Sequence, residues 1–340
     1  MLHFRSPELG QFGRQQRHAR AHKIPVTVVT GFLGAGKTTL VKTLLGTPEG
    51  RNTAVVVNEF GAVGIDDALL RASADETVLL GNGCLCCNVR SDLQLALRRL
   101  VAERERGEVP HFARIVIETS GLADPGPILR TFATDRALGE AFHVEAAVAV
   151  VDAATGARSL EEFAEARAQV ILADRMVLTK ADLADAASIE RLTKRLRELN
   201  PRADIVAAHH GALDPQVLLG GALSGDRQYL AEAAHSDGIG SFVLREEAPL
   251  AFETFSRFME TLTALRGGDL LRVKGLLHVA GCNGPVVVQF VQHLAHPPVE
   301  LAEWPDGERD SRVVFITRNV PEADVRGLFE AVRALSKPSP

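Results

Sequence analysis

The sequence predicts an α/β protein in which a doubly wound, mostly parallel sheet is followed by a second, smaller α+β domain. From residue 24 onward, short apolar runs rich in β-branched residues alternate with longer segments of helical periodicity. Most of these runs are continuously apolar, which is typical of strands buried on both faces of a parallel sheet. The alternation stops in a stretch rich in Gly, Ala, Ser and Asp at residues 211–240, which has the composition of a connection between domains.

The elements predicted for the first domain, residues 24–210, follow one another as in a doubly wound fold with right-handed crossovers. One helix is predicted where leucines recur at helical spacing from Leu93, with Ser91 or Asp92 as its N-cap. Another covers residues 183–199 and ends before a proline. The strands are predicted at residues 24–30, 53–58, 77–80, 114–118, 146–151, 176–178 and 205–207.

The second domain, residues 241–337, mixes strand and helix patterns in the way of a small α+β unit. Residues 1–23 are polar and basic and have no usable apolar period, so we predict a loose tail there, with an organelle-targeting segment as the weaker alternative. The elements of the second domain are predicted as strands at residues 242–245, 271–279, 286–292 and 313–317, and as helices at residues 253–265 and 320–335.

The composition limits the classes of function. The 340 residues carry a net charge of −5, with 46% hydrophobic and 24% charged residues, as in ordinary globular proteins. This balance argues against nucleic acid as a partner. No apolar run approaches the roughly 20 residues that cross a bilayer, which argues against a membrane protein. Three of the four cysteines lie together and we find no secretory apolar segment, so we expect the reducing cytoplasm.

A glycine-rich loop directly follows the first predicted strand and opens a helix, which is the context of a P-loop. The backbone N–H groups of such a loop surround a phosphate, and the helix N-terminus adds positive potential. Lys37 is expected to reach the β- and γ-phosphates, and the hydroxyl of Thr38 to ligate Mg²⁺. The first domain is therefore predicted to be a P-loop NTPase domain. Its phosphate-binding residues are expected to be Gly31, Gly34, Ala35, Gly36, Lys37, Thr38 and Thr39.

The segment from Thr179 to Asp182 follows another predicted strand and resembles the guanine-reading box Asn-Lys-x-Asp. The Asp182 carboxylate would accept hydrogen bonds from the two guanine donors that adenine lacks, while Lys180 would pack over the base. Thr179 replaces the usual Asn, so one orienting side-chain amide is missing. The box favours GTP and leaves ATP open.

The apolar strand at residues 114–118 ends in Glu118 and is followed shortly by Gly121, which is the form of a Walker B strand. The carboxylate of Glu118 would hold Mg²⁺ through water or orient the attacking water. The N–H of Gly121 would contact the γ-phosphate and move when GTP is hydrolysed. Together with Lys37, these two residues are the predicted catalytic group.

Three cysteines within four positions, Cys84, Cys86 and Cys87, stand in a glycine-flanked segment after another predicted strand. If the loop turns, their thiolates converge into a soft anionic pocket that suits Zn²⁺, with Co²⁺ as the other candidate. Inert buried thiols and a redox-sensing pair are the competing interpretations. Glu59 and Asp66 are predicted at the same carboxyl edge of the sheet, where either one could complete a metal shell or respond to the nucleotide.

Taken together, these motifs resemble the CobW-like family of P-loop GTPases, and the Cys-x-Cys-Cys loop is the discriminating feature. The resemblance continues into the family's carboxy-terminal domain through residues such as Arg272, Trp304 and Phe315. It departs from many members at the connection between domains, where a His-rich stretch is reduced to His235. The segments that carry it in the first domain are residues 31–38, 57–61 with 65–66, 83–87, 118–125 and 173–183.

The resemblance implies GTP hydrolysis coupled to metal handling, most often of zinc and in some branches of cobalt. By the family pattern, the three cysteines bind the delivered metal, with Glu59 as their oxygen neighbour. We assign Thr38 and Asp66 to Mg²⁺.

We therefore expect a GTP-dependent metallochaperone that uses GTP, Mg²⁺ and Zn²⁺ or Co²⁺. It would pass the metal to a client protein, which we expect at the carboxy-terminal domain, and a homodimer is the oligomer we consider. Two alternatives stay open: a redox-sensing nucleotide switch without metal cargo, and a cobalt-handling accessory protein of cobalamin synthesis.

Overall fold

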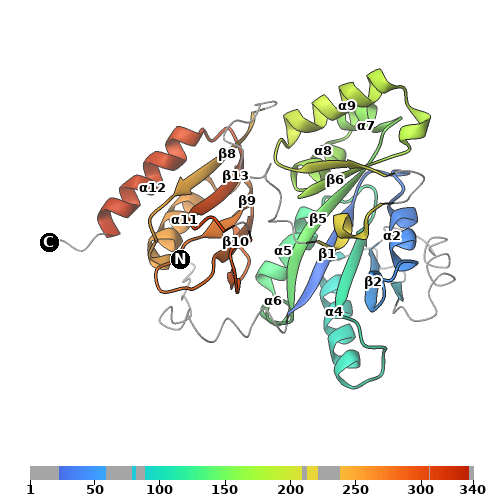
Figure 1. Cartoon of the computed structure of the whole chain (residues 1–340), viewed down its shortest axis with the longest axis horizontal. Coiled ribbons are helices and arrows are strands. Elements are labelled where there is room, and N and C mark those ends of the chain that lie inside the picture. The colour runs from blue at the N-terminus through green and yellow to red at the C-terminus, as the bar shows by residue number, and fades with distance from the viewer. Residues whose placement is uncertain are drawn as a thin grey trace. The chain divides into compact units, whose positions relative to one another are not determined.

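The computed structural model describes residues 23–58, 79–81, 89–208, 213–220, 238–305 and 307–336 (Figure 1). These fall into two compact units, one made of the described residues between 24 and 220 and the other of those between 238 and 336. Residues 1–22 of the predicted tail, and most of the predicted connection at residues 211–240, lie outside the described residues.

The described strands of the first unit form one sheet of seven strands in the order β3-β2-β4-β1-β5-β6-β7. All neighbouring strands run parallel, as the continuous apolar runs predict. The strands are β1 (Ile24–Thr30), β2 (Thr53–Asn58), β3 (Leu79–Gly81), β4 (Arg114–Thr119), β5 (Phe142–Asp152), β6 (Arg175–Thr179) and β7 (Asp204–Ala207).

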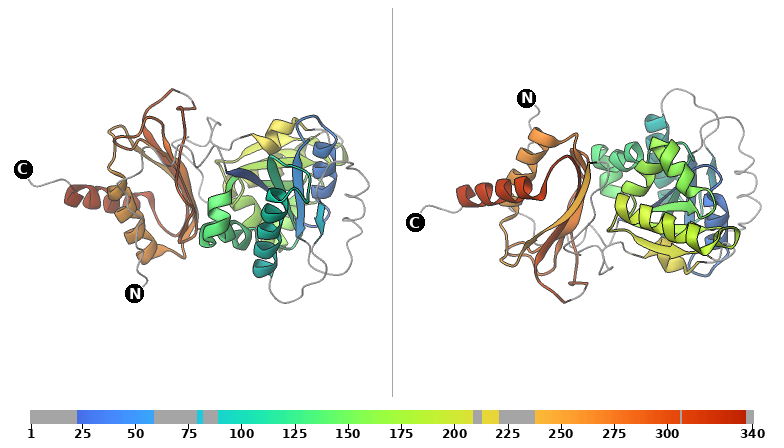
Figure 2. Two further views of the ribbon diagram at one scale, coloured as in Figure 1. Left: turned by 90° about the horizontal axis from the view of Figure 1, so that it is seen from below. Right: turned by 90° about the horizontal axis from the view of Figure 1, so that it is seen from above.

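Helices cover both faces of this sheet (Figure 2). Helices α2 and α10 share an apolar cluster with the central strands. The helices from α4 to α9 connect strands that step the other way along the sheet, and right-handed crossovers place them on the opposite face. The helices are α2 (Lys37–Leu45), α4 (Val89–Glu105), α5 (Gly126–Thr134), α6 (Arg136–Ala141), α7 (Gly156–Glu162), α8 (Ala164–Ile171), α9 (Ala186–Leu199), α10 (Pro215–Leu219) and the short 3₁₀ helix η2 (Ala181–Leu183).

Two predicted helix starts are wrong. Helix α4 begins at Val89, so neither Ser91 nor Asp92 is its N-cap, because no glycine or proline stops the helix from extending to Val89. Helix α9 begins at Ala186 rather than at residue 183. Its N-cap is Asp185, whose carboxylate accepts a hydrogen bond from the N–H of Ser188 at 2.8 Å, and residues 181–183 form η2 instead.

The second unit is an antiparallel sheet in the order β11-β10-β9-β13-β8, with β12 paired to β10. Helices α11 and α12 pack on one face over an apolar core that contains Phe258, Phe315 and Phe329 (Figure 2). The predicted α/β sheet followed by a smaller α+β unit is thus confirmed. The elements are β8 (Ile239–Glu246), α11 (Phe252–Arg266), β9 (Leu270–Leu277), β10 (Val286–Val291), β11 (Leu294–Ala295), β12 (Val299–Glu300), β13 (Ser311–Arg318) and α12 (Glu322–Ser336).

Among the described residues, no helix combines the length and the apolar character that a membrane crossing requires.

Candidate functional site

The predicted site residues that the structure describes gather at the carboxyl edge of the parallel sheet. Glu118 on β4 is in register with Val29 on β1 and with Val57 on β2, and Val57 is in register with Gly81 on β3. The P-loop begins two residues after Val29, at Gly31. This edge is where ligands bind in open α/β sheets.

The P-loop backbone passes close to β5 and turns into α2. A Cβ on Gly31 would lie 2.2 Å from the carbonyl oxygen of Val150, so only glycine fits there. Gly36 has a φ of 91° and is the N-cap of α2, and as a glycine it offers no side-chain cap to the first N–H groups of the helix. An anion can therefore take these N–H groups as donors, as the motif predicts.

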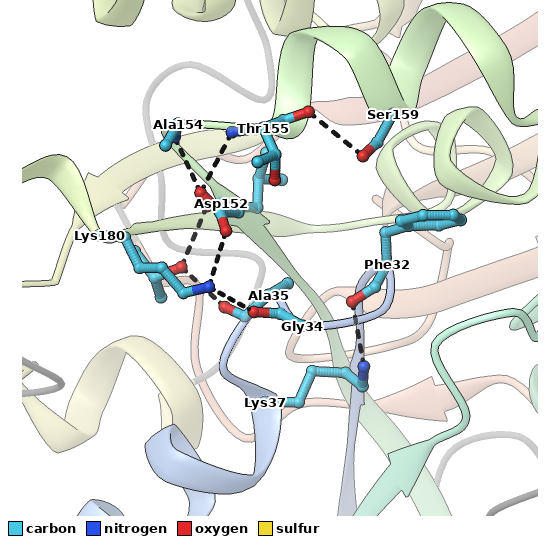
Figure 3. Close-up of polar contacts among 11 residues, drawn as sticks. Phe32, Gly34, Ala35, Lys37, Asp152, Ala154, Thr155, Ser159 and Lys180 are labelled. Carbon is cyan, nitrogen blue, oxygen red and sulfur yellow. Dashed lines mark hydrogen bonds and ion pairs between the residues drawn. The ribbon is translucent and has the colours of Figure 1, made fainter. Parts of the chain in front are cut away.

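Lys37 and Thr38, the predicted phosphate and Mg²⁺ residues, have hydrogen-bond partners in the P-loop and on β4. The buried Lys37 points back into the loop, where its Nζ donates hydrogen bonds to the carbonyl oxygens of Gly31 at 2.9 Å and Phe32 at 3.3 Å (Figure 3). The hydroxyl of Thr38 donates to Oε1 of Glu118 at 2.6 Å. Glu118 is 5% exposed, so the structure brings the P-loop and the end of β4 together in a largely dry place.

The predicted base-reading box is tied to the P-loop at two points. The hydroxyl of Thr179 donates to the carbonyl oxygen of Ala35 at 2.7 Å. The Nζ of Lys180 donates to the carbonyl oxygen of Gly34 at 2.7 Å (Figure 3). Thr179 therefore supplies a donor to the loop even though it lacks the amide of the usual Asn. Asp182 lies in η2 and is exposed, and Thr39 is exposed in the first turn of α2.

Asp152, at the end of β5, contacts the predicted base-reading box and was not singled out by the sequence analysis. Its buried carboxylate accepts hydrogen bonds from Nζ of Lys180 at 2.8 Å and from the N–H groups of Ala154 and Thr155 (Figure 3). Burial by itself would raise the pKa of Asp152, but the bond from Lys180 and the two amide bonds outweigh it and lower that pKa. Its place directly after an apolar strand is the signal that identified Glu118, so Asp152 could have been found in the same way.

Gly121, a predicted catalytic residue, lies against the P-loop. A Cβ there would lie 2.7 Å from the backbone nitrogen of Leu33, so the two loops meet backbone to backbone. A second residue missed from sequence, Gln169 on α8, donates hydrogen bonds from Nε2 to the carbonyl oxygens of Gly121 at 3.1 Å and Ala123 at 3.0 Å. Nothing in the sequence around Gln169 signals this contact.

The predicted ligands of the transferred metal, Cys84, Cys86, Cys87 and Glu59, lie outside the described residues, as does Asp66. Within the described ranges, no three His, Cys, Asp or Glu side chains stand close enough to hold a metal ion. The cysteine assignment therefore stays a prediction.

Comparison with known proteins matches both units to family models. Residues 25–207 match the CobW/HypB/UreG nucleotide-binding domain, and residues 239–333 match the cobalamin synthesis protein cobW C-terminal domain. The resemblance seen in the sequence is thereby confirmed.

Full-length relatives are also similar to the chain. The zinc chaperone YjiA of Escherichia coli is 36% identical over 91% of this chain and 99% of the relative. The zinc chaperone CobW of Pseudomonas aeruginosa is 33% identical over 89% of this chain and 90% of the relative. Among solved structures, Zn(II)-bound YjiA GTPase from E. coli matches with a TM-score of 0.65 and 32% identity, over 92% of this chain and 99% of that one.

Proposed function

This chain belongs to the CobW/HypB/UreG family and is a GTPase, and we propose that it couples GTP hydrolysis to the delivery of Zn²⁺ to a client protein. Relatives that are similar over nearly their whole length carry the names zinc chaperone and GTPase, which supports this proposal. A metallochaperone of this kind uses the nucleotide as a timing device and the metal as its cargo.

GTP binding begins at the P-loop. The ammonium of Lys37 leaves the carbonyl oxygens of the loop and pairs with the β- and γ-phosphates, while the N–H groups at the start of α2 receive phosphate oxygens. Lys180 packs over the base and Asp182 accepts hydrogen bonds from guanine. Because Thr179 and Lys180 are bonded to the loop, base and phosphates are held by one connected structure.

Thr38 and Glu118 fit a Mg²⁺ ion. A hydroxyl oxygen and a carboxylate oxygen 2.6 Å apart form the hard oxygen donor set that this ion prefers. When bound, Mg²⁺ neutralises charge on the phosphate oxygens. Glu118 also orients the attacking water, and Gly121 donates its N–H to the γ-phosphate. Asp66 as a further Mg²⁺ ligand stays a prediction.

The observation that carries the coupling to metal is the register of the sheet. Gly81 stands two strands from Glu118 in the same row, which places the two backbones on the order of 10 Å apart. Cys84 follows Gly81 by only three residues. The chain therefore ends β3 at the level of Glu118, three residues before Cys84. We propose that loops that move on hydrolysis change the affinity of the cysteine segment for Zn²⁺.

A competitive chelator titration of the reduced protein tests the proposal. Zn²⁺ and Co²⁺ are each titrated with GDP and with a non-hydrolysable GTP analogue plus Mg²⁺, for the wild type, for Cys86→Ser/Cys87→Ser and for Cys282→Ser. Cys282 packs against the core of the second unit and serves as the matched control thiol. We expect tight Zn²⁺ binding that differs between nucleotides and is lost only in the double variant. Binding that ignores the nucleotide, or that survives in the double variant, would refute the proposal.

The receiving client, its contact with the carboxy-terminal domain, a homodimer and the cytoplasm as the compartment stay predictions.

A further inference from the structure

The turn that follows β4 is pressed against the P-loop and closed on itself. The N–H of Ala123 donates to the carbonyl oxygen of Ser120 at 3.0 Å, which forms a tight turn around Gly121. Because the backbone of Gly121 meets the backbone of Leu33, a shift of this turn moves it relative to the phosphate-binding loop. The position of the turn therefore sets where the N–H of Gly121 points.

The side chain of Gln169, on helix α8, binds this turn through hydrogen bonds. Gln169 is 1% exposed, and its amide nitrogen donates to two carbonyl oxygens of the turn, those of Gly121 and Ala123. A primary amide has two N–H donors, so both are used on the same turn. Carbonyl groups offer only acceptors, so a side chain without donors could not replace the amide here.

The helix that carries Gln169 is itself fixed to the nucleotide edge. At its N-terminus, the ring of Phe163 packs on that of Phe32 in the P-loop, with ring centroids 4.5 Å apart. At its C-terminus, the buried amide of Asn200 donates to the carbonyl oxygens of Val170, Ile171 and Ala173. Helix α8 thus contacts both the P-loop and the turn after β4, and it holds the turn in position relative to the P-loop.

We propose that Gln169 is a positioning residue for GTP hydrolysis, whose side-chain amide holds the turn after β4 so that the N–H of Gly121 meets the γ-phosphate. The inference rests on the GTPase activity and on the role of Gly121. It does not depend on Zn²⁺. The role of Gln169 can therefore be refuted while the metallochaperone proposal stands, and the metallochaperone proposal can be refuted while the role of Gln169 stands.

The Gln169→Met variant removes both donors while keeping an unbranched side chain of similar length. The turn after β4 then loses its two hydrogen bonds to α8, while the hydrogen bonds of the P-loop stay as they are. We therefore expect kcat for GTP to fall by about tenfold. The KM for GTP and the Kd for GDP should stay within about twofold of the wild type, since they depend on interactions that are unchanged. A kcat at the wild-type level would overturn the proposal, and so would a parallel loss of kcat and of GDP affinity.

Thr131→Val is the matched control, because it also removes a buried side-chain donor to a backbone carbonyl group, that of Pro127 within α5. Its bond involves neither α8 nor the turn after β4, so this variant should lower the Tm without lowering kcat. If it lowers kcat as much as Gln169→Met does, the effect of Gln169 is one of general stability and the proposal is wrong.

The Gln169→Glu variant supplies a readout that does not depend on how well Gln169→Met folds. As a carboxylate, the introduced group repels the two carbonyl oxygens, but as a neutral acid it donates one hydrogen bond and restores part of the contact. Burial and the carbonyl groups raise the pKa of the introduced group. The kcat of this variant relative to wild type should therefore rise between about pH 8 and about pH 6. A ratio that does not change with pH would overturn the proposal.

Discussion

The hydroxyl of Thr179 provides the sharpest test of how the base-reading box supports the P-loop. Thr179 is 6% exposed, and its hydroxyl donates to the carbonyl oxygen of the buried Ala35 at 2.7 Å. The Thr179→Val variant keeps the shape of the side chain and removes only this donor. The carbonyl group of Ala35 then loses the bond that crosses from β6 to the loop.

The expected magnitude follows from that geometry. Leaving a buried acceptor without its donor costs about 1–3 kcal/mol. Lys180 still bonds the carbonyl oxygen of Gly34, but its side chain is 38% exposed, so this second contact compensates only in part. We therefore expect the variant to destabilise the observed conformation of the P-loop by about 1–2 kcal/mol. If GDP binds this conformation, the Kd for GDP rises by about 5- to 30-fold.

Two measurements check this expectation: titration calorimetry with GDP, and urea unfolding without nucleotide. Thr131→Val is the matched control, since Thr131 is buried and its hydroxyl donates to the carbonyl oxygen of Pro127 within α5. The control should lower the stability and leave the Kd for GDP unchanged. If Thr179→Val binds GDP as the wild type does, the hydroxyl does not hold the P-loop and the reasoning fails.

Three further outcomes are expected. Lys37→Ala should abolish GDP and GTP binding in titration calorimetry, because the ammonium that lies inside the loop is removed; retained binding would contradict the P-loop assignment. Cys86→Ser/Cys87→Ser should weaken Zn²⁺ binding in a chelator competition but keep the wild-type affinity for GDP, and a loss of both would mean that the segment is structural. Asp152 has a lowered pKa in the folded state, so its contribution to stability is present above the unfolded pKa and is lost as the pH falls through the folded one. The Asp152→Asn variant should therefore be less stable than wild type in urea unfolding at neutral pH. This difference in stability should shrink as the pH falls below about 4. A difference that stays constant with pH would mean that the charge of Asp152, and hence its pair with Lys180, does not stabilise the fold.

The sheet could be predicted closely because its signal is local. The bounds of β1 and β2 agree with the predicted apolar runs, since a strand buried on both faces must be apolar along its length. Helix starts could not be predicted as well, because several polar residues compete for the N-cap. Asp185 is chosen at α9 by a bond to Ser188 that is visible only in the folded chain. Strands β11 and β12 were missed because two residues carry no periodicity.

The same reasoning separates the site residues. The position of Lys37, Thr38 and Glu118 at one edge of the sheet could be predicted, since a local motif and the strand ends place them there. Gln169 could not, because its partners are backbone carbonyl groups 48 and 46 residues away, and a carbonyl group has no signature in the sequence. Asp152 falls between the two cases: its position at a strand end was visible, but its bond to Lys180 was not.

The register row of the sheet also limits how hydrolysis and metal release can be coupled. One row across four parallel strands contains Val29, Glu118, Val57 and Gly81. The valine, isoleucine and alanine residues of β1, β2 and β4 are buried. The P-loop leaves this row near Val29, and the cysteine segment follows Gly81. We propose that the loss of the γ-phosphate acts through the loops at the carboxyl edge of the sheet. The proposed coupling therefore requires an exchange of contacts between neighbouring loops over a short distance, and no rearrangement of the sheet itself.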